Sequence, residues 1–292
     1  MRVLVTADLH YDTPRSRAGA EALAERAVRD GGDALVLVGD SASAEHQPLR
    51  DCLNLFADFP GLKLLVPGNH CLWCLPGENS IQRYEQVVPA IAAEAGFAVL
   101  DHQPVVTDGV ALIGSIGWYD YSYRDEQLAI PLEFYRAKVS PGAAERLNEH
   151  RHLVESFRPH LTERHFNLGV RWMDGVHVRM EMTDEEFLEY VLAKLTAQLQ
   201  AIGADESVRR VAAFVHHLPF RQLVPSDRPD AFAFAAAYMG SDRIGEALRG
   251  CEKLTHVFCG HSHWRGRCRV GDIDVINVGS TYEQKHLEVV QL

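Results

Sequence analysis

Five short motifs rich in Asp, Asn and His carry the residue types that bind divalent metal ions in proteins. Because they combine carboxylate or amide oxygen with imidazole nitrogen, they suit Mn, Fe or Zn better than Mg or Ca, which favour oxygen alone. They include carboxylates able to bridge two ions, and together they supply enough ligands for a pair. In chain order the motifs are Asp8-Leu-His10, Gly39-Asp40, Gly68-Asn69-His70, His216-His217 and Gly260-His261-Ser-His263.

A pair of such ions predicts hydrolytic chemistry on a phosphate ester. Two ions about 3.5–4 Å apart share a hydroxide, lower its pKa towards neutrality and hold a phosphoryl oxygen for in-line attack. Such a site needs no nucleophile from the protein. The motifs therefore predict a two-metal phosphoesterase in which a hydroxide that bridges the metals attacks phosphorus.

Each motif comes directly after a short apolar run, which predicts a buried strand. Between the first two runs, residues 18–30 have apolar side chains at helical spacing and stop at Gly31-Gly32, as is typical of a helix C-terminus. A second helix is expected over residues 48–59. All five motifs thus lie just past a strand, where binding sites form in open α/β sheets. The predicted strands are residues 2–6, 34–38, 62–66, 211–215 and 255–259.

The order of the motifs resembles the calcineurin-like metallophosphoesterase superfamily, whose pattern runs Asp-x-His, Gly-Asp, Gly-Asn-His-Asp/Glu, His, Gly-His-x-His. The resemblance covers about residues 2–120 and 208–292, and Val275-Ile-Asn-Val-Gly-Ser280 is similar to the strand that often follows the last motif. It implies an α/β fold, a four-layer α/β/β/α sandwich of two facing mixed sheets with the metals at their strand ends. The resemblance indicates the superfamily but does not identify the substrate.

The resemblance also implies a role for each motif residue. His70 would not bind metal but would face the phosphate, where it stabilises developing charge or protonates the leaving oxygen. Asn69 is expected to contact the substrate as well. Of the neighbours His216 and His217, which point to opposite faces of a strand, family usage favours the first as the ligand. The expected ligands are Asp8, His10 and His263 for one ion, Asn69, His216 and His261 for the other, and Asp40 bridging both.

One departure from the family pattern is Cys71, which stands where Asp or Glu usually follows Gly-Asn-His. That acid normally supports its neighbours, and the loss of such support costs about 10–100-fold in metal affinity or activity. We therefore expect either reduced activity or another carboxylate in its place. Cys71 and Cys74 also form a CxxC, which alone would suggest a redox pair or half a zinc site; no second CxxC and no obvious helix follow it.

Residues 118–203 break the pattern of strand and ligand and contain two helical segments, so we predict a helical insertion or cap within a single domain of residues 1–292. One helix is expected to begin at Ser140-Pro141, and another at Thr183, which forms a capping-box pattern with Glu186. The histidines and arginines interleaved in the insertion are typical of a solvated helix face. A weaker alternative is a cap that grips phosphate through Arg.

Trp118 and Arg124 are candidate substrate contacts at the start of the insertion. Aromatic rings stack on bases or sugars, and Arg binds phosphate. The alternative is ordinary packing at a domain junction, where aromatic side chains are common.

Composition and net charge also indicate which kinds of binding partner to expect. A net charge of −11 disfavours tight binding to nucleic-acid backbones but leaves a small phosphorylated substrate possible, since two bound dications make a pocket locally positive. No apolar run approaches the ~20 residues of a membrane span, and Met1 to Ala7 leave no room for a removable signal, so we expect a cytoplasmic protein. Six cysteines are too sparse for a disulfide scaffold.

Several functions stay open at this stage. Phosphodiesters and phosphomonoesters pass through the same two-metal chemistry, so the motifs do not separate them. Serine/threonine protein phosphatase activity is a second candidate, although a bulky cap would block a folded protein surface. A non-catalytic metal-binding scaffold and a thiol-redox protein built on the CxxC are alternatives from other classes. No oligomeric state is indicated.

Overall fold

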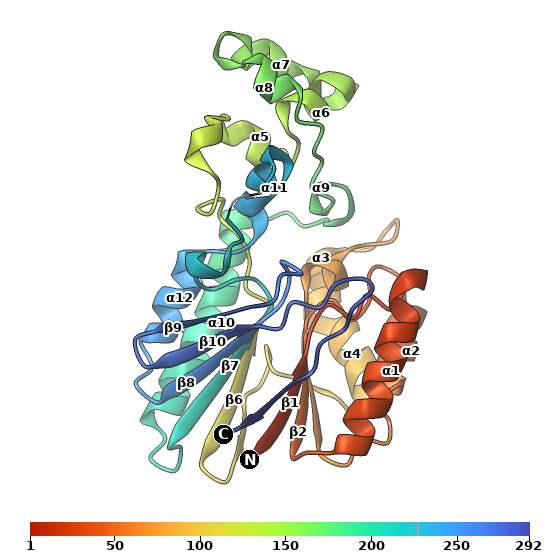
Figure 1. The fold of residues 1–292 in the computed structure, drawn as a ribbon, viewed down its shortest axis with the longest axis vertical. Coiled ribbons are helices and arrows are strands. Elements are labelled where there is room, and N and C mark those ends of the chain that lie inside the picture. Colours follow the sequence, from red (N-terminus) through yellow and green to blue (C-terminus); the bar gives the residue numbers. More distant parts are fainter. Residues whose placement is uncertain (227) are drawn as a thin grey trace.

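Two mixed β-sheets pack face to face in the computed structural model, which describes residues 1–226 and 228–292 (Figure 1). The first sheet has the order β11-β1-β2-β3-β4, in which β11 is antiparallel to β1 and the others run parallel. The second has the order β5-β6-β7-β8-β10-β9, with antiparallel strands at both edges. The strands are β1 Arg2–Thr6, β2 Ala34–Val38, β3 Leu62–Val66, β4 Ala98–Val99, β5 Val105–Thr107, β6 Val110–Ser115, β7 Arg210–Val215, β8 Leu254–Cys259, β9 Gly266–Val270, β10 Ile273–Asn277 and β11 Glu288–Gln291.

The strands that carry the motifs are buried on both faces. Val3 and Val5 of β1 belong to the apolar cluster between the sheets, together with Phe214 of β7 and Phe258 of β8, whereas Leu4 belongs to the cluster beneath the helices. Successive side chains point to opposite faces of a sheet, so a strand covered on both sides reads as a continuous apolar run. This burial explains why the sequence signal before each motif is strong.

Helices cover the outer face of each sheet and complete four layers, which confirms the predicted α/β/β/α sandwich (Figure 1). The helix expected over residues 18–30 begins earlier, with Pro14 in its first turn, and the one expected over 48–59 already ends at Asn54. The capping box of Thr183 and Glu186 is present. The layer helices are α1 Pro14–Asp30, α2 His46–Asn54, α3 Ser80–Gln82 and α4 Val88–Glu94 on the first sheet, and α10 Asp184–Ala204 and α12 Asp242–Arg249 on the second.

The remaining helices stand above the sheets, and we call them the cap (Figure 1). The cap is built from two separate segments, because α11 follows β7, and Arg164 joins the segments through two 2.7 Å hydrogen bonds to Asp230. The cap helices are α5 Leu132–Arg136, α6 Pro141–Arg146, α7 Arg151–Phe157, α8 Glu163–Phe166, α9 Asp174–His177 and α11 Asp230–Ala235.

The structure divides the helical insertion expected over residues 118–203. Its long last helix, α10, packs against β6 as a layer helix, so we propose a cap role only for α5 to α9 together with α11. Ser140 precedes α6 as expected, but its hydroxyl donates to Leu168 O at 2.6 Å and accepts from the Val170 amide, and so ties the cap together instead of capping the helix. Among the described residues, no helix has the length and apolar character needed to cross a bilayer.

Candidate metal centre

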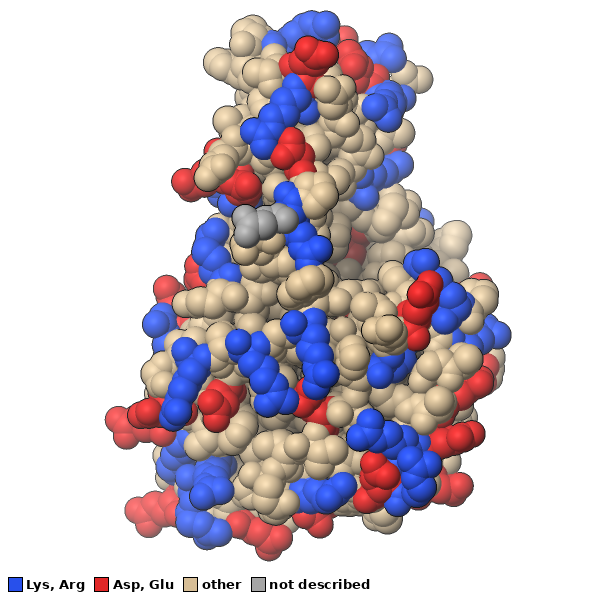
Figure 2. All heavy atoms as spheres, viewed as in Figure 1, with Lys and Arg blue, Asp and Glu red and all other residues tan. Residues whose placement is uncertain are grey.

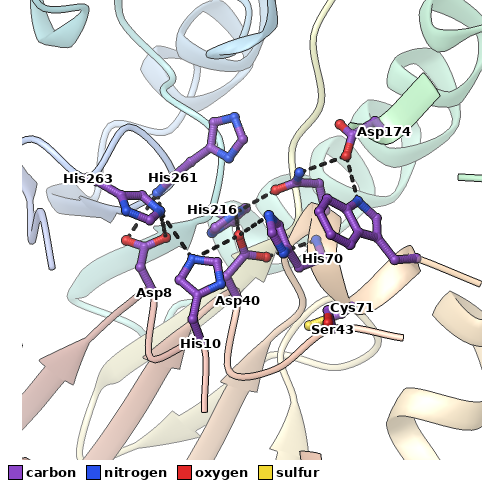
Figure 3. Close-up of polar contacts among 12 residues, drawn as sticks. Asp8, His10, Asp40, Ser43, His70, Cys71, Asp174, His216, His261 and His263 are labelled. Carbon is purple, nitrogen blue, oxygen red and sulfur yellow. Dashed lines mark hydrogen bonds and ion pairs between the residues drawn. The ribbon is translucent and has the colours of Figure 1, made fainter. Parts of the chain in front are cut away.

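All five motifs lie just past the carboxyl ends of β1, β2, β3, β7 and β8, and backbone hydrogen bonds join the first motif to the second and the fourth to the fifth. The Asp8 amide donates to Gly39 O at 3.1 Å, and the His10 amide donates to Asp40 O at 2.8 Å. The Gly260 amide donates to His216 O at 3.2 Å, which links two loops of the second sheet. The motif side chains are therefore held at one edge shared by the two sheets (Figure 3).

The backbone of the motifs is strained. Nine non-glycine residues of the described chain have positive φ, and five of them are motif residues. Such conformations cost about 1–3 kcal/mol each and persist where the surrounding structure enforces them, which is common at functional sites. The five are Asp8, His10, Asp40, His261 and His263.

Two motif glycines leave the space that the carboxylates occupy. A Cβ on Gly68 would lie 2.1 Å from Asp40 Oδ1, and one on Gly260 would lie 2.7 Å from Asp8 Oδ2. In that space Asp40 Oδ1 accepts from the His70 amide at 3.0 Å, and Asp8 Oδ1 accepts from the His261 amide at 2.9 Å. Each carboxylate is thus fixed by the backbone of a different motif.

The second oxygen of Asp40 lies at the middle of the cluster. Asp40 Oδ2 is 3.7 Å from His10 Nε2, 3.4 Å from His216 Nε2 and 3.9 Å from His70 Nε2 (Figure 3). The carboxylate is buried, with 1% of the residue exposed. This is the position that a carboxylate bridging two ions needs.

Ligand atoms gather on both sides of Asp40. On one side, those of Asp8, His10 and His263 lie within 4.8 Å of one another. On the other, those of Asp40, His216 and His261 do so, and Asn69 Oδ1 lies 3.2 Å from His216 Nε2. The structure therefore brings all seven predicted ligands together. His70 also falls in such a group, with His10 and Asp40, so proximity alone does not separate it from the ligands.

The chemistry of the donors fits divalent cations. Burial holds the pKa of His10 and of His261 well below the usual range and lowers the pKa of His263 to about 4, so these imidazoles are neutral, as metal ligands must be. His10 and His263 face each other with their Nε2 atoms 3.1 Å apart. Burial also raises the pKa of Asp8 to about 7. A cation between these groups would satisfy both nitrogens and stabilise the buried carboxylate.

His216 and His217 play different parts. Burial alone would lower the pKa of His216, but the charge and hydrogen bond of Asp40 outweigh it and raise that pKa to about 9. His217 turns away: its Nδ1 lies 2.9 Å from Ile116 O, and its Nε2 has no hydrogen-bond partner among the described residues. Burial lowers the pKa of His217 to about 3 and keeps the ring neutral behind the centre.

A cavity of about 410 Å³ opens from the ligands towards the cap. Figure 2 shows the surface hollowed where the cap meets the sheets. The ligand end is polar, with His70 in its wall, whereas the cap end is mainly apolar. Arg171 lies in the wall as well and donates to Glu149 at 2.9 Å. The apolar wall comprises Trp73, Val170, Trp172, Met173, Phe232, Ala235 and Met239.

The structure corrects two predicted substrate contacts. Trp118 is fully buried, with 0% exposed, and its Nε1 donates to Asp184 at 2.9 Å, so the ring is part of the core. Arg124 donates to Tyr121 O at 3.3 Å and is not part of the cavity wall. The packing alternative therefore describes Trp118, and the aromatic wall of the cavity comes from other segments.

The CxxC does not form a reactive pair. Cys71 and Cys74 are both free and buried. Cys71 Sγ lies 3.8 Å from Ala42 O, and burial raises the pKa of this thiol to about 11. Figure 3 shows Cys71 apart from the ligand cluster. A thiol held in its protonated form is a poor nucleophile, which argues against the redox alternative.

Three polar residues near the ligand candidates were not predicted from the sequence. Lys285 donates to Asp8 O at 2.7 Å, and Tyr282 lies in the cavity wall with its ring 4.8 Å from that of His10. Asp174 accepts a hydrogen bond from Asn69 Nδ2 at 2.9 Å. None of the three directly follows an apolar strand, so the signal that revealed the motifs does not apply to them.

Comparisons with known proteins agree with this geometry. The family model for calcineurin-like phosphoesterases matches residues 1–265, and no curated protein matches the chain. Phosphopantetheinyl hydrolase from Mycobacterium tuberculosis has a similar structure over 96% of this chain and 89% of its own, with 18% identity and a TM-score of 0.67. A protein of Thermus thermophilus is similar over 99% of this chain and 97% of its own, with 12% identity and a TM-score of 0.53. Likeness at these identities shows a shared fold, and because the family match spans all five motifs, the chain belongs to the calcineurin-like phosphoesterases.

Proposed function

We propose that this phosphoesterase hydrolyses a small phosphate ester whose organic part is largely apolar. The observation that carries the proposal is the cavity, because candidate metal ligands form one end and an apolar wall forms the other. The phosphate would bind at the ligands and the organic group along Trp172, Met173 and Phe232. Burial of apolar surface contributes about 25 cal/mol per Å², so such a wall distinguishes esters by their organic part.

The residues present would hold two divalent ions of Mn, Fe or Zn. Asp8, His10 and His263 surround one position, Asn69, His216 and His261 surround the other, and Asp40 lies between them. When bound, the ions would lower the pKa of an attacking water and neutralise charge on the phosphoryl group. The chain's own contribution is to hold these ligands in one buried arrangement.

His70 is proposed to act on the leaving group. Its side chain is 18% exposed and lies in the cavity wall. Its amide is fixed by Asp40 Oδ1, and its ring stacks on Trp73 with centroids 3.7 Å apart. An imidazole held in this way beside the phosphate site would donate a hydrogen bond or a proton to the leaving oxygen.

The size of the cavity favours a small substrate over a folded protein. The cap overhangs the ligands, and about 410 Å³ is in the range of small-molecule sites. On the face shown in Figure 2, Lys and Arg are interspersed with Asp and Glu and form no continuous basic surface for a nucleic acid. Protein phosphatase activity is therefore a weaker candidate.

The first assay compares bis-p-nitrophenyl phosphate with p-nitrophenyl phosphate on metal-stripped protein reconstituted separately with Mn, Fe, Zn, Ni or Mg. We expect turnover only with added metal, and a preference for the first substrate would identify a phosphodiesterase. A phosphopantetheinyl ester is the first natural type to test, because it combines phosphate with a long organic arm and is named in the activity of one similar structure. Failure to hydrolyse any of these esters with two ions bound per chain would contradict the proposal.

A further inference from the structure

Asp174, at the start of α9 in the cap, receives four hydrogen bonds, two on each carboxylate oxygen. Oδ1 accepts from Asn69 Nδ2 at 2.9 Å and from Trp73 Nε1 at 2.7 Å. Oδ2 accepts from Tyr119 OH at 3.0 Å and from Trp172 Nε1 at 2.8 Å. Only 1% of the residue is exposed. A buried carboxylate with this many donors is a fixed point between the cap and the metal centre (Figure 3).

The contact with Asn69 determines which way the amide of Asn69 faces. A carboxylate only accepts hydrogen bonds, so the NH₂ end of the amide must point at Asp174. The oxygen end then points the other way, to within 3.2 Å of His216 Nε2. That oxygen is the atom a metal ion would bind, and the reverse orientation would present NH₂ to the cation instead.

The contact with Trp73 acts on His70. The Trp73 ring stacks on that of His70, with a centroid distance of 3.7 Å and an interplanar angle of 23°, and also on that of His177, at 4.5 Å and 25°. The hydrogen bond from Nε1 to Asp174 prevents the indole from turning in its plane. One carboxylate thus holds both Asn69 and the ring that packs against His70.

We propose that Asp174 is a positioning residue for the metal centre and takes over the supporting role of the acid that is missing at Cys71. It acts through Asn69 and Trp73 and does not itself contact substrate. The inference rests on the proposed function, because it takes Asn69 to be a metal ligand. The proposal also means that the metal site is complete only when the cap packs against the sheets and brings Asp174 to Asn69.

Asp184 provides a matched control. It is also a buried acid, with 5% exposed, and it accepts from Trp118 Nε1, Tyr121 OH and Lys138 Nζ. It therefore resembles Asp174 in burial and in having Trp and Tyr donors, but it is paired with the Lys138 ammonium instead of the Asn69 amide and accepts no hydrogen bond from a motif residue. If the removal of any buried carboxylate weakens metal binding, variants of both residues should lose metal affinity.

The test is equilibrium metal binding, measured by calorimetric titration of the metal-free protein with Mn²⁺ or Zn²⁺. Asp174→Ala should weaken the binding of one of the two ions by about 10–100-fold, whereas Asp184→Ala should leave both affinities unchanged. Asp174→Asn keeps one acceptor oxygen, so it should lose less metal affinity than Asp174→Ala. If an alanine variant does not fold, Asp174→Asn and Asp184→Asn are compared instead. In an Asn69→Ala background, Asp174→Ala should cause no further loss.

Wild-type metal affinities in both Asp174 variants would overturn the proposal. So would equal losses of metal affinity in the Asp174 and Asp184 variants, or a loss from Asp174→Ala in the Asn69→Ala background as large as in the wild type. Hydrogen exchange of the Asn69 side-chain amide, measured by NMR in the metal-free wild type, needs no variant: slow exchange supports the buried contact and rapid exchange contradicts it. Wild-type protein that binds two ions but hydrolyses no ester would refute the proposed function, yet the effect of Asp174 on metal affinity would still be measurable.

Discussion

Gly39 precedes Asp40 and packs against a metal-ligand candidate, so its replacement by alanine should disrupt the metal centre. A Cβ at position 39 would lie 1.9 Å from His216 Nδ1, whereas ordinary contact begins at 3.4 Å, so the imidazole would have to retreat by about 1.5 Å. His216 would then lose its place 3.1 Å from Val38 O and 3.4 Å from Asp40 Oδ2. Metal–ligand distances tolerate only about 0.2 Å, so the nitrogen would no longer reach an ion.

Gly39 also has φ +84°, and that cost must be separated from the clash. Gly77 has φ +89° but no atom within 4 Å of an added Cβ, so Gly77→Ala isolates the backbone cost. We expect Gly77→Ala to cost about 1–2 kcal/mol of folding free energy and to leave activity intact. Gly39→Ala carries a similar backbone cost and should in addition lose about 10²-fold or more in kcat/KM, because a displacement of about 1 Å in a catalytic arrangement already costs that much.

The assay pairs thermal unfolding with hydrolysis of bis-p-nitrophenyl phosphate and a metal count for each variant. Gly39→Ala should bind fewer than two ions per chain under conditions that saturate the wild type. Wild-type turnover and two bound ions in Gly39→Ala would refute the reasoning, since they would show that His216 is not needed where the structure places it. An equal loss of activity in Gly77→Ala would assign the effect to backbone strain or to general destabilisation.

The other predictions concern the bridging carboxylate, the protons at the centre and the cavity wall. Asp40→Asn keeps the shape of the side chain but removes its charge, and hydrolysis should fall to the uncatalysed rate; retained turnover would contradict a bridging role. Without metal the pKa of Asp8 is about 7 and that of His216 about 9, so metal binding must displace the protons of these groups. Metal affinity should therefore rise about tenfold per pH unit between pH 7 and 9, where only His216 is protonated, and more steeply between pH 5 and 7, where both groups are. Calorimetry in buffers of different ionisation enthalpy counts the released protons, and pH-independent binding without proton release would argue against this pair as ligands. Phe232→Ala removes part of the apolar wall and should raise KM by about tenfold for a p-nitrophenyl phosphodiester with a long alkyl group, but not for its methyl analogue. Equal changes for both esters would place the organic group elsewhere.

Much of the fold could be predicted because its signals are local. Strands β1, β2 and β3 have the predicted bounds, because the parts of these strands next to the motifs are buried on both faces and form continuous runs of mainly apolar residues. The capping box at Thr183 was recognisable from two residues three positions apart. The seven ligand candidates belong to short motifs directly after such strands, and the family resemblance distinguished them from His70 and His217 in the same motifs.

The sequence was less informative where a residue's neighbours lie far away along the chain. Trp118 and Arg124 had suitable chemistry for a substrate site, but the aromatic wall comes from Trp73, Trp172 and Phe232. The cap recruits α11 from beyond β7, and α10, at the end of the expected insertion, belongs to the outer layer. No spacing rule along the chain predicts which of several aromatic or basic residues will face a cavity.

The sequence by itself indicated the buried strands and the segments that carry the ligand candidates, because both are visible in consecutive residues, and the family that the motifs resemble implied the sandwich of two sheets. Only the tertiary structure decided how the side chains of those ligand candidates are supported. Asp174 and Asn69 are 105 positions apart, yet a hydrogen bond of 2.9 Å joins them where the cap meets the metal centre. A contact of this kind depends on how the cap packs on the sheets, and packing is a property of the whole folded chain.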